Sequence, residues 1–136
     1  MAESIEEFLP GVRENGIRTL KNIGFNTGAG AAVTQATNRT TGVTINTLCG
    51  TITTNNASLG AELSASFVVT NSTVAIGDVV LVSQQSGAVG VMTTVEVIAT
   101  AAGSFTLAVM NGNAAAGTAE TGAILVNFAV IKAVSA

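Results

Sequence analysis

Apolar and polar residues alternate with a period of two along much of the chain after residue 40. In the segment LSASFVVT (residues 63–70), every second residue is apolar, from Leu63 to Val69. Successive side chains of a strand point to opposite faces of a sheet, so this alternation predicts a half-buried strand. The closing segment AILVNFAVIKAV (residues 123–134) predicts another in the same way. Further strands are expected within residues 43–52, where Gly50 breaks the pattern, and within 78–82, 91–100 and 104–110.

Short segments of Gly, Asn, Ser and Ala separate these expected strands. Ala101-Ala102-Gly103 has the length of a hairpin link, Asn111-Gly112-Asn113 is a further turn, and Ala114–Gly117 is expected to be a loop. Six or seven short strands joined in this way are typical of an all-β fold. We therefore predict an antiparallel β-sandwich, jelly-roll or Ig-like, with a barrel as the related possibility.

The distribution of charge divides the chain into two parts. Residues 1–39 contain eight of the thirteen charged residues, and the shift in composition lies near Gly28-Ala29-Gly30. This predicts an N-terminal docking arm with a Gly-rich hinge over residues 1–30 and a β-sandwich body over residues 31–136. The apolar residues of the arm are too irregularly spaced to form a core, so we expect them to dock on another surface: Phe8, Leu9, Val12, Ile17, Leu20, Ile23 and Phe25.

Composition makes an assembly component more plausible than a free monomer. Charged residues are 10% of the chain against about 25% in an ordinary soluble domain, while 48% are apolar and mean hydropathy is +0.57. The apolar runs, such as FAVI (residues 128–131), are far shorter than the roughly 20 residues of a spanning helix, so no membrane segment is expected. We expect a surface so poor in charge to be covered by copies of the chain or by a larger assembly. A net charge of −3 gives no basic field for nucleic acid.

Candidate chemistry is sparse. The chain contains no His, Tyr or Trp, which excludes the usual nucleophile–histidine arrangements. Cys49 is the single cysteine, so no intrachain disulfide can form, and it is expected to be a small buried hydrophobe. Glu96 is expected to face solvent from a strand and Asp78 to lie in a turn. No catalytic, cofactor-binding or metal-binding residue is predicted, and no cofactor.

Two cations stand in otherwise uncharged surroundings. Arg39 lies in a Thr-rich stretch and Lys132 near the end of the last expected strand. Each is expected to be either an exposed cation or a contact across a subunit interface.

Three phrases of the sequence resemble small virion proteins of tailed bacteriophages. They are VTQATNRTTGVTINTLCGTITT (residues 33–54), SFVVTNSTVAIGDVVLVS (66–83) and NFAVIKA (127–133), and the resemblance extends from about residue 28 to the end. Such proteins decorate capsids as cement proteins or form head fibres. The resemblance implies a β-sandwich, often a homotrimer, that binds the major capsid protein at symmetry axes or between capsomers. It also implies that the apolar residues of the arm, with Arg39 and Lys132, contact the capsid or another subunit. It implies localisation on the capsid surface of the virion after assembly in the bacterial host cytoplasm.

Two other classes of function remain as alternatives. One is a head-fibre or tail-fibre module that binds a host receptor, although the lack of Trp and Tyr disfavours sugar stacking. The other is a lyase or glycosidase domain, which the missing catalytic groups disfavour. The acidic N-terminus MAESIEEFLPG has no basic segment followed by an apolar one, so cytoplasmic synthesis without secretion is expected.

Overall fold

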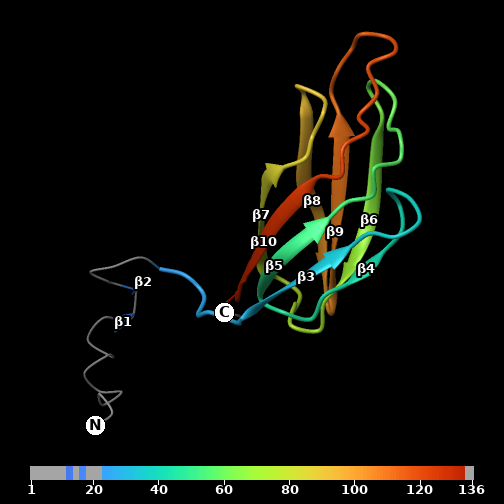
Figure 1. Cartoon of the computed structure of the whole chain (residues 1–136). Helices are drawn as coiled ribbons and strands as arrows, with labels where there is room; N and C mark the ends of the chain where they lie inside the picture. The colour runs from blue at the N-terminus through green and yellow to red at the C-terminus, as the bar shows by residue number, and fades with distance from the viewer. Residues whose placement is uncertain (1–11, 14–15, 18–22, 134–136) are drawn as a thin grey trace.

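The chain folds as a β-sandwich of two four-stranded sheets (Figure 1). The computed structural model describes residues 12–13, 16–17 and 23–133. The first sheet has the order β3-β5-β10-β7, with the bounds β3 Gly30–Thr34, β5 Cys49–Thr53, β10 Leu125–Ile131 and β7 Val79–Ser86. The second has the order β4-β6-β9-β8, with the bounds β4 Val43–Thr44, β6 Ser64–Thr70, β9 Ser104–Asn111 and β8 Thr93–Ala101. Two short strands that precede them, β1 (Val12–Arg13) and β2 (Gly16–Ile17), pair with each other in antiparallel fashion.

The all-β sandwich is confirmed, but its sheets are mixed rather than purely antiparallel. The edge strand β3 runs parallel to β5, and β4 runs parallel to β6, while the other pairs in the two sheets are antiparallel. The chain crosses from the first sheet to the second at β4 and returns at β5 before it continues to β6. This path gives both parallel pairs the long connection that a parallel neighbour requires.

Most predicted strands lie where the alternation places them. β6 and β10 alternate between exposed and buried residues, and β7 extends the expected segment as far as Ser86. The segment 43–52 is different, because β4 and β5 within it belong to different sheets. Gly50 does not interrupt a strand; it lies inside β5, where a Cβ would come within 2.5 Å of the Ala31 carbonyl oxygen. Glycine is needed there for the close approach of β3.

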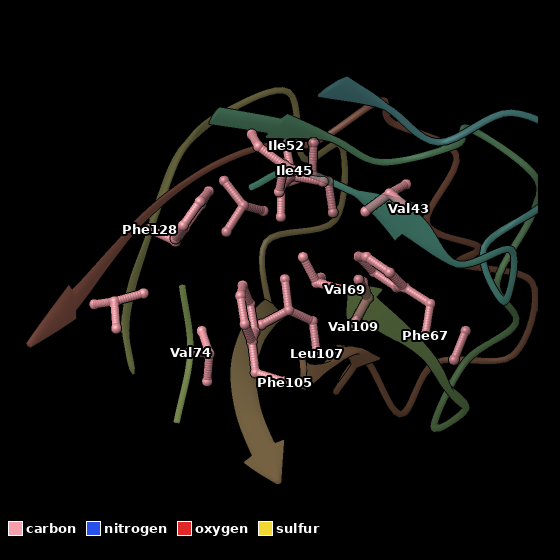
Figure 2. Close-up of a cluster of buried hydrophobic side chains, with 14 of the residues drawn as sticks. Val43, Ile45, Ile52, Phe67, Val69, Val74, Phe105, Leu107, Val109 and Phe128 are labelled. Carbon is pink, nitrogen blue, oxygen red and sulfur yellow. The ribbon is translucent and has the colours of Figure 1, made fainter. Parts of the chain in front are cut away.

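A single core fills the space between the sheets. The inward-facing residues of the second sheet include Phe67, Val69, Phe105, Leu107 and Val109, and those of the first include Ile52, Val126, Phe128 and Val130. Figure 2 shows Ile52 and Phe128 of the first sheet on one side of the core, with Phe67, Phe105 and Leu107 of the second sheet on the other. The rings of Phe105 and Phe128 join the two sheets, with centroids 5.5 Å apart and a tilted geometry. The core therefore follows directly from the alternation of side chains along β6, β9 and β10.

The sandwich has two distinct ends. At one end of the first sheet, which we call the basal end, β3 and β7 begin and β10 ends. The register shows this: Gly30 pairs with Cys49, Cys49 with Ala129, and Ile131 with Val79. The opposite apical end, uppermost in Figure 1, carries the loops that connect β5 to β6, β7 to β8, and β9 to β10. β8 and β9 meet at the basal end in the expected hairpin, where Gly103 has a φ of 76°.

Truncating the centre of the core tests this arrangement. Leu107 is fully buried, so Leu107→Ala should lower the free energy of unfolding by about 2–5 kcal/mol through lost burial and the cavity left behind. Val68, on the neighbouring strand, faces outward, so Val68→Ala should change the free energy of unfolding by less than about 1 kcal/mol. Urea unfolding of both variants measures the difference in stability. Equal losses of stability would contradict the described packing of Leu107 in the core.

Candidate functional site

The outer face of the first sheet has no charged residue in its cross-strand rows. Its cross-strand rows run from Val79–Ile131 at the basal end, through Leu81–Ala129–Cys49, to Ser83–Asn127–Thr51. The Thr51 hydroxyl donates a hydrogen bond to the Asn127 side-chain oxygen at 2.9 Å, which orders the polar row. An apolar part thus adjoins a neutral polar part on one surface.

A hollow lies on this face between β7 and β10. It is lined by Leu81, Val82, Ser83, Asn127, Phe128 and Ala129 and has a volume of about 410 Å³. We call it the β7–β10 hollow. Ala129 has a small side chain between the larger ones of its neighbours, and Leu81 is half-exposed at the rim. The hollow offers an apolar contact surface with two neutral hydrogen-bonding groups.

The outer face of the second sheet consists mainly of small side chains. Ser66 pairs with Ala108 and Val68 with Thr106, and Ala108 in turn pairs with Glu96. Glu96 is exposed, as expected from its place in the alternation. Apart from this carboxylate the face presents hydroxyls, small aliphatic side chains and the exposed Met110, which pairs with Ser64 and Thr94.

Large apolar side chains protrude from the apical end. In the connection between β7 and β8, which we call the apical loop (residues 87–92), the exposed fractions are 66% for Val89, 91% for Val91 and 58% for Met92. Leu63, at the start of β6, is exposed at the same end. Soluble domains rarely expose apolar side chains in such a group without a contact to make.

A buried carboxylate fixes the apical loop from below. Glu120 is fully buried, and its carboxylate accepts hydrogen bonds from the backbone N–H groups of Gly90 at 2.7 Å and Val89 at 3.1 Å. The Thr93 hydroxyl donates to it at 2.5 Å and the Gly122 N–H at 2.6 Å. Burial alone raises the pKa of Glu120, but these four donors together outweigh it and lower the pKa to about 2.

Arg39 is also buried at the apical end, so the expectation that it is an exposed cation or a subunit contact is wrong. Only 3% of Arg39 is exposed, so it is neither a surface cation nor a contact between subunits. Its guanidinium donates to the carbonyl oxygens of Ala57 at 2.5 Å, Glu120 at 3.1 Å and Gly122 at 3.0 Å. Desolvation lowers the pKa of Arg39, and the charge of Glu120 opposes that change. Burying a guanidinium is tolerated here because neighbouring carbonyls and a carboxylate compensate its charge.

An ion pair closes the basal end. Lys132 contacts the carboxylate of Asp78 and also donates to the Thr73 carbonyl at 2.8 Å. Asp78 further accepts from the N–H groups of Ala75 and Ala133, and its own N–H closes the turn by donating to the Ala75 carbonyl. The hydrogen bond from Lys132 and those from the backbone lower the pKa of Asp78 to about 2. Asp78 is thus the turn residue that was predicted, and Lys132 is half-exposed but paired within its own chain.

The predicted contact residues of the arm are mostly not testable here. Phe8, Leu9 and Leu20 lie outside the described residues, and Val12 and Ile17 lie in β1 and β2 without described side chains. Ile23 and Phe25 are exposed. Cys49, expected to be buried, is only partly so and faces outward from β5.

Within the described residues, no group of three or more acidic or Cys side chains is placed to hold a metal ion. The same part of the chain contains no helix of the length and hydropathy needed to cross a bilayer. Comparison with protein-family models, curated proteins and solved structures returned no match. The interpretation of function therefore depends on the surfaces described above.

The buried polar residues were missed by sequence reasoning. Glu120, Gln35, Asn71 and Asn111 are all at most 1% exposed. Asn111, for example, donates to the carbonyl oxygens of Leu59 and Thr118 and so joins two apical loops. One available signal was position, since Asn71 and Asn111 stand at the ends of predicted strands, where loop carbonyls need donors.

Replacing the buried carboxylate should destabilise the apical end. Glu120→Gln places an amide where four donors converge and removes a negative charge that offsets the buried Arg39, so the free energy of unfolding should fall by about 3–5 kcal/mol. Glu96 is exposed, so Glu96→Gln is the matched control and should change the free energy of unfolding by less than about 0.5 kcal/mol. Urea unfolding would contradict the described cluster if the two variants were equally stable.

The pH dependence of stability should be simple. The chain has no His, so the melting temperature should stay nearly constant between pH 5 and pH 8. Below that range it should fall as the pH approaches 2, because Asp78 and Glu120, with ordinary pKa values of 3.8 and 4.5, bind protons more readily in the unfolded chain. Thermal unfolding followed by circular dichroism measures this curve. A maximum of stability below pH 3 would show that these carboxylates are not held as described.

Proposed function

We propose that this chain is a structural virion protein that decorates and stabilises a phage capsid by binding capsid subunits at symmetry axes or between capsomers. The observation that supports this most is the lack of charge on the surface of the sandwich. Residues 31–133 include six charged side chains, of which Arg39, Asp78 and Glu120 are buried. The exposed ones are Glu62, Glu96 and the paired Lys132.

Such a surface suits permanent contacts. Burying Ser, Thr, Ala and Val side chains removes apolar area from water without the desolvation penalty of unpaired charges. A standard interface buries about 1,600 Å² in total, and a neutral sheet face can supply its share with neutral hydrogen bonds at the rim. Repetition over a shell would then add avidity to contacts that are individually weak.

Self-association, with a homotrimer as the expected state, is part of the proposal. The strands β3, β4, β7 and β8 are edges of their sheets in the described part of the chain. Edge strands expose unpaired N–H and C=O groups, which natural proteins usually protect by charge, distortion or a neighbour. Irregular register marks β7 and β8, and β4 is only two residues long, but β3 pairs regularly and has no charged residue. A neighbouring copy or a capsid subunit is the protection that we infer for this edge. The N-terminal arm would bind the major capsid protein.

The second candidate function is a head-fibre or tail-fibre module that binds a host receptor. The observation in its favour is the protruding apical loop, whose exposed Val and Met side chains could insert into a receptor surface. The two functions separate experimentally, because a cement protein acts on the shell and a receptor module acts on adsorption.

Binding to capsid shells tests the proposal. Full-length chain added to shells of its phage that lack it should co-sediment to a fixed copy number and raise the temperature at which the shells disrupt. A chain without residues 1–22 should bind about tenfold more weakly or worse, because the arm contacts would be lost. Normal shell stability without the protein, together with a loss of adsorption to host cells, would overturn the cement function in favour of the receptor module.

A further inference from the structure

We propose that Asn111, in the pair Asn111-Gly112 at the end of β9, is a site of deamidation that the folded apical end protects, and that its conversion to a carboxylate keeps this end from closing. An Asn followed by Gly loses ammonia more readily than other Asn residues, because glycine has no Cβ to hinder the approach of its backbone nitrogen. The modification needs water and no enzyme. It concerns the chain alone and does not depend on capsid binding.

The reaction proceeds through a cyclic imide. The backbone nitrogen of Gly112 loses its proton to hydroxide and attacks Cγ of Asn111, so that a new C–N bond forms and the bond from Cγ to Nδ2 breaks. The side-chain nitrogen leaves as ammonia with a proton from water, which restores the hydroxide. Water then opens the imide at one of its two carbonyls and yields Asp or isoaspartate. The net change exchanges water for ammonia, and nothing is oxidised or reduced.

The fold keeps the attacking nitrogen in a hydrogen bond. The N–H of Gly112 donates to the carbonyl oxygen of Met92 at 3.0 Å, so the nitrogen retains its proton while the apical loop is in place. A Cβ at position 112 would come within 3.1 Å of the same oxygen, which favours glycine there. The glycine that makes the pair reactive is therefore also the glycine that the close approach of the apical loop requires.

The Asn111 side chain is fixed as well. It is 1% exposed, and its Nδ2 donates to the carbonyl oxygens of Leu59 at 3.0 Å and Thr118 at 2.8 Å. Its Oδ1 accepts from the N–H of Asn113 at 3.2 Å. Ammonia can leave only if both hydrogen bonds of Nδ2 break, and water must reach a buried position. Deamidation is therefore expected to wait until the apical loops separate.

A carboxylate at position 111 does not fit the closed site. It has no hydrogen to donate, so it would face the carbonyl oxygens of Leu59 and Thr118 with like partial charge. It would also lie close to a second carboxylate. Asn111 Oδ1 and Glu120 Oε2 both flank Gly90, at 3.8 and 3.1 Å from the position that a Cβ of Gly90 would take. Repulsion at both places opposes the closing of the loops.

The rate of deamidation tests the protection. The full-length chain is incubated in mildly alkaline buffer, folded and unfolded in guanidinium chloride, and proteolysis with mass spectrometry follows the loss of ammonia at each Asn. Asn111 should react at least about 100-fold more slowly in the folded chain, because reaction requires opening. Equal rates in the two states would overturn the proposal, as would an Asn111 that does not react in the unfolded chain.

The variant Asn111→Asp tests the consequence, because it introduces the product directly. Asn113→Asp is the matched control: its side-chain oxygen accepts from the N–H of Ala115 at 3.2 Å, a role that a carboxylate keeps. At neutral pH, amide hydrogen exchange in the apical loop should be at least about tenfold faster in Asn111→Asp than in the unaltered chain. In Asn113→Asp it should be nearly unchanged. Unchanged exchange in Asn111→Asp would overturn the proposal.

The pH dependence of Asn111→Asp separates charge from altered packing. The other charged groups of the described apical end are Glu120, the buried Arg39 and the exposed Glu62. Arg39 directs its guanidinium to carbonyl oxygens, so the carbonyls and carboxylates around the new acid should raise its pKa above the ordinary value.

A raised pKa means that the variant is destabilised as the pH rises. Relative to the unaltered chain, Asn111→Asp should be least destabilised at about pH 4, where the neutral acid can still donate a hydrogen bond, and increasingly so toward about pH 7. Unfolding of both chains in guanidinium chloride at several pH values measures this difference. A variant that folds only at the lower pH would agree with the proposal. A difference independent of pH would overturn it, because charge would then not be the cause.

Discussion

The apical end of the sandwich depends on one residue, Glu120, whose buried carboxylate accepts hydrogen bonds from the apical loop and whose backbone carbonyl accepts one from the buried Arg39 guanidinium. Strand pairing holds the middle of each sheet, but at this end several loops meet without a ladder of hydrogen bonds. Glu120 gathers the N–H groups of the apical loop, and Arg39 gathers the carbonyls of the connections on either side. Leu59 and Glu120 also exchange backbone hydrogen bonds at 3.0 and 2.9 Å. Small residues dominate these loops, so polar contacts replace the large side chains that would otherwise close the core.

Local patterning predicted the part of the fold that depends on nearest neighbours. The alternation along β6 and β10 located both strands and the faces that they bury. It failed where the decisive neighbour is distant in sequence. Gly50 looked like an interruption because the carbonyl of Ala31, which requires a glycine there, cannot be inferred from adjacent residues. Likewise the separation of β4 and β5 into different sheets depends on pairing with β6 and with β10.

The same limit explains Arg39. A lone cation in a Thr-rich stretch is usually exposed, and its acceptors lie as far as 83 positions away along the chain. The burial of Glu120 could not be predicted from its neighbours either, because Val89 and Gly90, which donate to its carboxylate, lie about 30 positions earlier. By contrast Asp78 was predicted correctly as a turn residue, because the turn that it closes is local. For the surfaces, composition predicted the scarcity of charge, and the structure adds that half of the charged side chains of residues 31–133 are turned inward.

A rigid, neutral sandwich that meets its partners through apolar surfaces is the central claim of this account. Amide hydrogen exchange on the full-length chain, in dilute and in concentrated solution, tests it most directly. We expect association to slow exchange along the edge strands β3, β4, β7 and β8 and in the exposed apical loop (residues 87–92), and to leave the central strands β6 and β9 unchanged. Equal exchange at both concentrations would contradict the claim.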